Sequence, residues 1–193
     1  MIEEQKVIKG QKAVLREKRV SDADNDYAWR CDPELSRYDA TVPLKLSFRE
    51  YMLYYTEQLQ NPKEGRRWFA IDSLDGKHIG NCMYYDVDES RKHAKIGVII
   101  GEREYWGKGH GADALNSLVS YIFAETDLDR VYLDTLDWNK RAQRCFQKCG
   151  FVVCGRLSKK GSNFVIMELH RSWLKPDRGE PHSANSSKFH DAT

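Results

Sequence analysis

Apolar side chains recur at two different spacings along the chain, and the two spacings predict both helices and strands. Through residues 48–59 they return every three or four positions, which is the period of a helix. Ser47 and Glu50 form a capping box that marks where this helix begins. The same spacing predicts a helix through residues 115–123 and a shorter one over 140–149.

The first part of the chain has weaker patterns. Residues 12–19 have the composition of a short strand. Ser21 and Asp24 have the spacing of a capping box, which predicts a helix over residues 22–31. The segment 31–46 contains two prolines and is predicted to be an irregular loop.

Three strands follow one another in the middle of the chain. Residues 67–72, 78–87 and 93–101 are rich in aromatic and β-branched side chains, and short polar turns separate them. Asp75 and Gly76 are expected at the turn between the first two strands, which predicts a hairpin. The three strands are therefore expected to form an antiparallel meander.

The second half of the chain alternates helices with strands and closes with a hairpin. Residues 130–136 form an apolar strand, expected to run parallel to the last meander strand after a right-handed helical crossover. Residues 151–157 and 163–170 are predicted to pair as the hairpin. The expected fold is a single α/β domain with a mixed, mostly antiparallel central sheet of six to seven strands and helices on both faces.

Length and charge narrow the class of protein. A chain of 193 residues is long enough for one domain with its own core. We expect an N-terminal extension over 1–11, the folded domain over 12–171 and a disordered polar tail over 172–193. A net charge of +2 does not favour nucleic acid or a membrane as partner. No apolar run has the length of a membrane span and the charged start is no signal peptide, so a cytoplasmic protein is expected.

The five cysteines predict neither disulfides nor a metal site. Their number is odd, and no secretion signal accompanies them. Cys145 and Cys149 lie four positions apart, but no second pair completes the four ligands of a structural zinc site. Two buried thiols are the simpler interpretation, and we expect no metal.

Glycines alternate at Gly107, Gly109 and Gly111, immediately before a predicted helix. A Walker-type nucleotide loop is excluded because Lys108 is followed by Gly instead of Ser or Thr. A dinucleotide fingerprint fits formally, with Asp134 where a ribose ligand is expected, so a dinucleotide-dependent oxidoreductase is one alternative.

A third interpretation of the glycines requires only main-chain groups. Successive N–H groups at the start of a helix form a positive nest for a pyrophosphate, and glycines let the phosphate oxygens approach closely. A tight turn alone would not require three alternating glycines. We therefore expect a ligand that carries phosphate at this loop.

A second motif, Asn139–Phe151, narrows the ligand class. Together with residues 104–115 it resembles the GNAT superfamily of acyl-CoA-dependent N-acyltransferases. One family pattern, Arg or Gln, two residues, Gly, one residue, then Gly or Ala, falls on residues 106–111. A later family pattern falls on Asn139, Ala142, Phe146, Lys148, Gly150 and Phe151. The resemblance covers residues 12–170 and is closest to the branch with ribosomal-protein N-terminal acetyltransferases, alongside diamine and drug acetyltransferases.

The resemblance implies acetyl-CoA as co-substrate and a fold in which the last meander strand and the strand at 130–136 splay apart. Pantetheine is expected in that gap against Ile99–Gly101, with the pyrophosphate on Trp106–Ala112 and Asn139 on the pantetheine arm. A main-chain N–H near Gly101 is expected to polarise the thioester carbonyl. The expected cofactor-binding residues are Ile99, Ile100, Gly101, Trp106, Gly107, Lys108, Gly109, His110, Gly111, Ala112, Asn139 and Phe146.

Two positions depart from the family pattern. Trp106 replaces the Arg or Gln, which removes one side-chain contact to the cofactor. Phe146 replaces a Tyr that protonates the leaving thiolate in many relatives, although a thiol with a pKa of about 8.5 leaves as thiolate at modest cost. These departures support a rival interpretation, a non-catalytic acyl-CoA-binding module.

The implied activity is direct transfer of acetyl to a primary amine in a ternary complex. No strong base is evident, which favours an amine of low pKa. An α-amine with a pKa of about 7.7–8.0 is partly neutral at physiological pH, whereas a lysine amine at about 10.4 is almost wholly charged. A protein N-terminus is therefore favoured over a small-molecule amine.

Tyr84 and Asp134 are the candidate catalytic residues, relaying the amine proton through water. Both also have a purely structural interpretation, a core edge for Tyr84 and a paired carboxylate for Asp134. The resemblance is compatible with a homodimer through a sheet edge. Carboxylates that could hold a cationic acceptor are Asp32, Glu34, Asp39 and Glu50.

Overall fold

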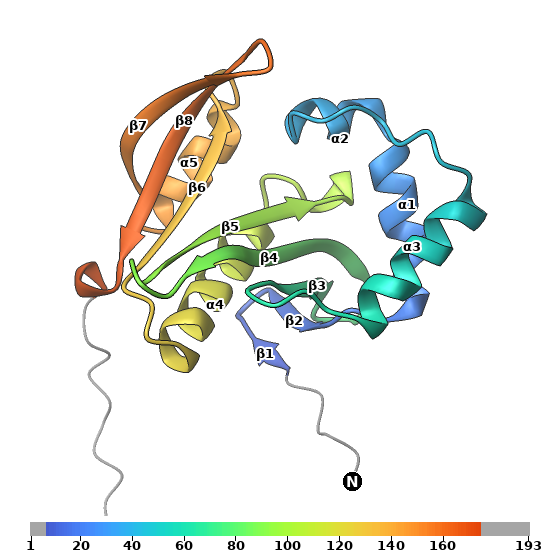
Figure 1. Cartoon of the computed structure of the whole chain (residues 1–193), viewed down its shortest axis with the longest axis horizontal. Helices are drawn as coiled ribbons and strands as arrows, with labels where there is room; N and C mark the ends of the chain where they lie inside the picture. Colours follow the sequence, from blue (N-terminus) through green and yellow to red (C-terminus); the bar gives the residue numbers. More distant parts are fainter. Residues whose placement is uncertain (1–6, 175–193) are drawn as a thin grey trace, which may run out of the picture.

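The computed structural model describes residues 7–174, which form an eight-stranded sheet with helices against both faces (Figure 1). The strand order across the sheet is β1-β2-β3-β4-β5-β6-β8-β7. The strands are β1 (Ile8–Lys9), β2 (Ala13–Glu17), β3 (Arg67–Ser73), β4 (His78–Asp88), β5 (His93–Ile100), β6 (Arg130–Leu136), β7 (Val152–Lys159) and β8 (Ser162–His170). The helices are α1 (Ala23–Cys31), α2 (Pro33–Tyr38), α3 (Phe48–Gln60), α4 (His110–Glu125) and α5 (Lys140–Lys148), with 3-10 turns at Val20–Asp22, Arg103–Tyr105 and Arg171–Trp173.

The centre of the sheet holds a parallel pair, β5 and β6, and every other pair in residues 7–174 is antiparallel. Asn81 of β4 lies opposite Ile99 of β5, as the predicted meander requires. The parallel register between β5 and β6 ends where Lys95 pairs with Tyr132, and beyond it the two strands diverge (Figure 1). The expected splay of the central strands is confirmed.

Adjacent residues of β3 show how the sheet separates two layers of helices. The Trp68 ring packs against Tyr55 of α3 with centroids 5.7 Å apart, whereas the Phe69 ring packs against Tyr121 of α4 at 5.5 Å. Successive side chains of a strand point to opposite faces, so α3 and α4 cover different faces. The main core lies on the α4 face; its buried side chains include Leu15, Ile71, Ile96, Leu115, Leu118, Ile122 and Met167.

The sheet has one strand more than the six to seven expected. The additional strand is β1, where Ile8 and Lys9 pair with β2. Two residues are too few to show a strand period, so no pattern separated them from the predicted extension. Asp113 of α4 holds the turn that follows, because its carboxylate accepts hydrogen bonds from the main-chain N–H groups of residues 11–13.

Part of the predicted loop 31–46 is the helix α2. Asp32 caps this helix, since its carboxylate accepts hydrogen bonds from the N–H groups of Glu34 and Leu35 at 2.9 and 3.0 Å. Pro33 occupies the first helical position, where the missing N–H has no helical partner and the fixed φ favours the helix. The loop prediction was wrong because a proline that begins a helix was taken as one that breaks it.

Helix α1 begins at Ala23 and its N-cap is Asp22, without the predicted Ser21 cap. The Asp22 carboxylate accepts a hydrogen bond from the main-chain N–H of Arg19 at 2.8 Å. The capping box of α3 is present as predicted, with Ser47 and Glu50 bonded to each other's main chain.

The described residues end shortly after the last strand, in a short turn. The 3-10 turn Arg171–Trp173 crosses the predicted start of the tail at 172. Arg171 anchors this turn by donating to the carbonyl groups of Thr126 and Leu128, each at 2.6 Å. The rest of the predicted tail, like residues 1–6, lies outside the described residues. No helix within 7–174 is long and apolar enough to cross a membrane.

Candidate functional site

The glycine loop connects the end of β5 to α4 through the 3-10 turn Arg103–Tyr105. Gly107 has φ +72° and Gly109, the N-cap of α4, has φ +92°, a backbone conformation that other residues rarely adopt. A Cβ atom added at Gly107 would meet no protein atom within 4 Å. The loop therefore leaves its main chain open at the start of a 16-residue helix, where an anion is stabilised.

A cavity of about 380 Å³ lies against this loop, between the diverging end of β5 and helix α5. Nine of the twelve expected cofactor-binding residues line it: Ile99, Ile100, Trp106, Gly107, Gly109, Gly111, Ala112, Asn139 and Phe146. The structure thus brings together two motifs that are about thirty residues apart in the sequence.

The other three expected residues, Gly101, Lys108 and His110, do not line the cavity. The Lys108 carbonyl accepts a hydrogen bond from Lys12 Nζ at 2.9 Å. The His110 ring packs edge-on against Tyr105, with centroids 4.9 Å apart, and its buried Nδ1 has no hydrogen-bond partner among the described residues. Neither side chain is therefore part of the cavity wall.

The role expected for Gly101 is not supported by its hydrogen bonds. Its N–H donates to the Ile79 carbonyl of the neighbouring strand at 2.9 Å, and Trp29 packs directly against its Cα. Main-chain groups alternate in direction along an antiparallel strand, so those of the preceding residue, Ile100, face the splay. Trp106 Nε1 confirms this direction, because it donates to the Ile100 carbonyl at 2.6 Å.

The cavity beside the glycine loop is called the first cavity from here on, and most of the charged side chains that line it are positive. Arg141, Arg144 and Lys148 line it from one face of α5, and Asp39 is the carboxylate among its lining residues. Asn139 caps α5 by accepting a hydrogen bond from the Ala142 N–H at 3.2 Å, so its side chain is held in the cavity wall. Open glycine main chain, three cations and an apolar floor fit an acyl-CoA, whose diphosphate is anionic and whose pantetheine arm is extended.

A second cavity, of about 430 Å³, lies on the other side of the splay beneath α1, α2 and α3. Six aromatic residues line it: Trp29, Tyr51, Tyr54, Tyr55, Trp68 and Tyr85. Leu35, Asp39, Val98 and Ile99 line both cavities. The two cavities therefore share a junction, the stretch of wall that these four residues form.

Asp39 is the carboxylate at this junction. Its side chain is half-exposed, and burial by the surrounding protein raises its pKa. Arg30, 3.5 Å away, opposes that shift, and repulsion from Asp134 adds to it. The other three acidic candidates have structural partners: Asp32 and Glu34 bind Arg103, and Glu50 caps α3.

The two candidate catalytic residues occupy different places. Tyr84 is buried in the core on the α4 face, where burial and the neighbouring Tyr121 raise its pKa, and it lines neither cavity. The adjacent Tyr85 lines the second cavity instead. Asp134 lies beside the splay and forms an ion pair with Lys95.

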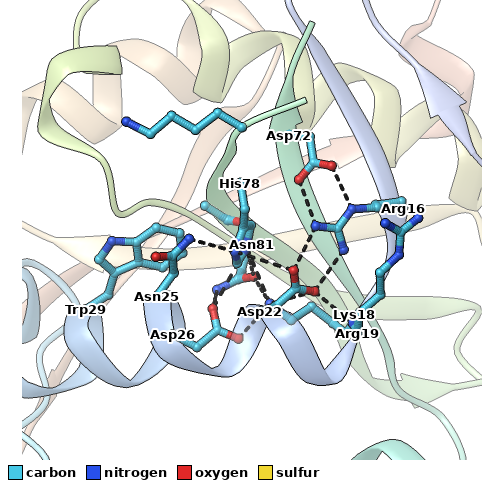
Figure 2. Close-up of polar contacts among 12 residues, drawn as sticks. Arg16, Lys18, Arg19, Asp22, Asn25, Asp26, Trp29, Asp72, His78 and Asn81 are labelled. Carbon is cyan, nitrogen blue, oxygen red and sulfur yellow. Dashed lines mark hydrogen bonds and ion pairs between the residues drawn. The ribbon is translucent and has the colours of Figure 1, made fainter. Parts of the chain in front are cut away.

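A buried polar network closes the floor of the second cavity, and sequence reasoning did not find it (Figure 2). Lys18 Nζ binds the Asp26 carboxylate and the Asn81 side-chain oxygen, each at 2.6 Å. Asn81 donates to the second oxygen of Asp26 at 2.6 Å, and both residues line the cavity. Burial lowers the pKa of Lys18, although the nearby Asp26 opposes that shift.

The next part of the network lies behind this floor. Arg16 donates to Asp22 at 2.7 and 2.8 Å and to Asp72 at 2.6 and 3.0 Å (Figure 2). Asp72 and Asn81 lie about fifty positions or more from the other members of the network, so no local spacing relates the two groups.

A splayed sheet with a glycine anion loop on one side and an amine-sized cavity on the other defines an acyl-CoA-dependent transferase. The chain belongs to the GNAT acetyltransferase family, because the family model described as acetyltransferase (GNAT) domain matches residues 12–152. It is therefore an acetyltransferase that takes its acetyl group from acetyl-CoA and passes it to an amine. The dinucleotide-dependent oxidoreductase and the non-catalytic binding module are set aside.

Individual relatives agree with the family. The chain is 28% identical to an uncharacterized N-acetyltransferase, p20, of Bacillus licheniformis, over 63% of this chain and 68% of that protein. It is 31% identical to the spermine/spermidine N(1)-acetyltransferase of Bacillus subtilis, over 65% of this chain and 90% of that protein. The fold matches the spermidine N-acetyltransferase of Vibrio cholerae, solved with CoA and spermine, with a TM-score of 0.74 at 22% identity over 83% of this chain and 96% of that one.

Proposed function

We propose that the acceptor is a small-molecule primary amine that enters the second cavity. The observation that carries this proposal is the junction of the two cavities at Val98 and Ile99, with Asp39 at the shared wall. The polyamines named for two relatives belong to this substrate class. Neither of these two relatives is named for a protein N-terminus as acceptor.

The wall of the second cavity favours an amine on an aromatic or apolar body. Its six aromatic rings can pack against such a body and attract an ammonium group through their faces. Arg30 and Arg66 also line the cavity, so its charge is mixed, and an acceptor with several positive charges is repelled. We therefore rank arylalkyl monoamines above polyamines.

Cofactor binding, stabilisation of the thioester oxygen and proton transfer are each assigned to residues of this chain. The main-chain N–H groups of residues 107–112 hold the cofactor's phosphates, and the outward N–H of Ile100 stabilises charge on the thioester oxygen. Asp39 holds the ammonium group and receives its proton through water. Asp134 repels the Asp39 carboxylate and so helps to raise its pKa. Tyr84 is assigned no role in proton transfer because the core encloses it.

A panel of acceptors tests the proposal. Release of the CoA thiol from acetyl-CoA would be followed with tyramine, tryptamine, spermidine, spermine and a short peptide with a free N-terminus. We expect turnover with the small amines, the arylalkyl amines first, and a rate near background with the peptide. Turnover with the peptide alone would refute the proposal and restore the protein N-terminus as acceptor.

Changing Asp39 to Asn is expected to lower the activity without lowering the stability of the fold. Losing the carboxylate removes the group that holds the amine, so kcat/KM for the amine should fall about tenfold or more, as for a lost charged hydrogen bond. The Asp39 side chain is half-exposed and its ion pair with Arg30 is a surface pair, so D39N should melt close to the wild-type temperature. Unchanged kcat/KM in D39N would exclude Asp39 from the site.

A homodimer through a sheet edge stays a prediction. The edge strand β7 exposes Val152, Val153 and Leu157 to solvent, which is the kind of surface that pairs with a second copy. Light scattering on the purified protein would measure the state directly.

A further inference from the structure

Trp106 stands where the GNAT pattern has Arg or Gln, and the structure shows what its ring does instead. Its indole N–H donates to the Ile100 carbonyl at 2.6 Å, which fixes the ring between the glycine loop and the splay. The Tyr38 ring of α2 meets it nearly at right angles, with centroids 5.6 Å apart. The two rings form a rigid aromatic corner at the wall of the first cavity.

Arg141, in the first turn of α5, lies in this corner. Its guanidinium carbon is 3.7 Å from the centroid of the Trp106 ring and 4.8 Å from that of the Tyr38 ring. Within residues 7–174 no carboxylate forms an ion pair with Arg141. A guanidinium held by its face keeps its N–H donors, which lie in its plane, free for another partner.

We propose that Arg141 is a cofactor-binding residue that supplies, from α5, a side-chain contact to the cofactor's phosphates in place of the contact that position 106 lacks. Trp106 is its platform: the ring holds the guanidinium in the cavity that Gly107 and Gly109 also line. A planar guanidinium donates two parallel hydrogen bonds to a phosphate, which an ammonium group cannot do in the same geometry. This inference rests on the acyl-CoA cofactor and is independent of the acceptor proposed above.

Direct binding measurements test the inference without enzyme turnover. Calorimetric titration with CoA would compare the wild type with R141A, R141K and the double variant W106R/R141A. We expect R141A to bind CoA about tenfold to hundredfold more weakly, which is the range for a lost hydrogen bond to a charged group. R141K should recover only part of this loss, and W106R/R141A should recover more because its cation comes from position 106.

The controls separate a contact with phosphate from a structural effect. Arg91, whose side chain is 77% exposed, gives the charge-matched control R91A, expected to bind CoA like the wild type. S-acetylpantetheine carries no diphosphate, so R141A should bind it as the wild type does. Titration with 3′-dephospho-CoA identifies the phosphate: an equal loss assigns the diphosphate, and no loss assigns the 3′-phosphate.

Two results would overturn the inference. One is a CoA affinity of R141A within twofold of the wild type. The other is an equal loss of affinity for CoA and S-acetylpantetheine, which would show that Arg141 acts only by holding α2 and α5 together through Tyr38. Thermal melts of each variant accompany the titrations. If W106R/R141A does not fold, the affinities of R141A and R141K still decide whether the inference holds.

Discussion

Replacing Arg16 with Met is expected to destabilise the protein by about 3–5 kcal/mol at pH 7, which is the range for breaking a buried ion pair from one side. Arg16 is buried and donates four hydrogen bonds to the carboxylates of Asp22 and Asp72. Met has a similar volume but no charge, so R16M leaves two buried carboxylates without their partner. Urea unfolding followed by circular dichroism measures the difference.

The effect of R16M depends on pH in a defined direction. Burial acts to raise the pKa of Asp22, but hydrogen bonds from Arg16 and Arg19 outweigh it and hold the pKa below its usual range. Asp22 therefore stabilises the wild type above its unfolded pKa of about 3.9, and this stability is lost as the pH falls through the lower folded value. In R16M, burial acts on Asp22 without the opposing guanidinium, so the Asp22 carboxylate takes up a proton more readily and the loss of stability should shrink from pH 7 to pH 4.

Two further variants test whether charge is the cause. The triple variant R16M/D22N/D72N removes the cation and both anions together, and it should lose less stability than R16M alone. The control R91M removes an exposed cation and should change stability by no more than about 0.5 kcal/mol. If R16M were as stable as R91M at pH 7, the network would not support the fold.

What the sequence predicted well was local. The capping box of Ser47 and Glu50, the hairpin turn at Asp75 and Gly76 and the glycine loop each depend on a few neighbouring residues with strong local preferences. The two motifs of the cofactor cavity were recognisable for the same reason. The antiparallel meander followed because short turns leave the chain only one neighbour to pair with.

The features that the sequence did not predict depend on contacts between segments that lie far apart along the chain. Tyr84 and Tyr85 are adjacent, so the choice of which one faces the second cavity requires the position of the whole sheet between α3 and α4. The partners of Arg16 lie 6 and 56 positions away, and no periodicity relates them. Similarly, the sequence showed Trp106 only as the loss of one side-chain contact to the cofactor, because its contact with Arg141 joins two separate motifs.

Changing Gly107 to Ala is expected to weaken acetyl-CoA binding at least tenfold while leaving the fold intact. A Cβ at Gly107 would meet no protein atom within 4 Å, so it would occupy the space where the loop's N–H groups meet phosphate. The positive φ of +72° adds a strain of about 1–2 kcal/mol to any residue other than Gly. Strain and loss of binding must therefore be measured separately.

Gly76 gives a matched control for that strain. Its φ is +85°, a Cβ there would also meet nothing within 4 Å, and it lies in the β3–β4 hairpin turn, outside both cavities. G76A and G107A should thus lose similar stability without ligand. At an acetyl-CoA concentration of a hundred times the wild-type Kd, the wild type and G76A should gain about 2.7 kcal/mol, and G107A at most about 1.4 kcal/mol. If G107A gained as much as G76A, the glycines would serve only the turn, and the phosphates would have to bind elsewhere.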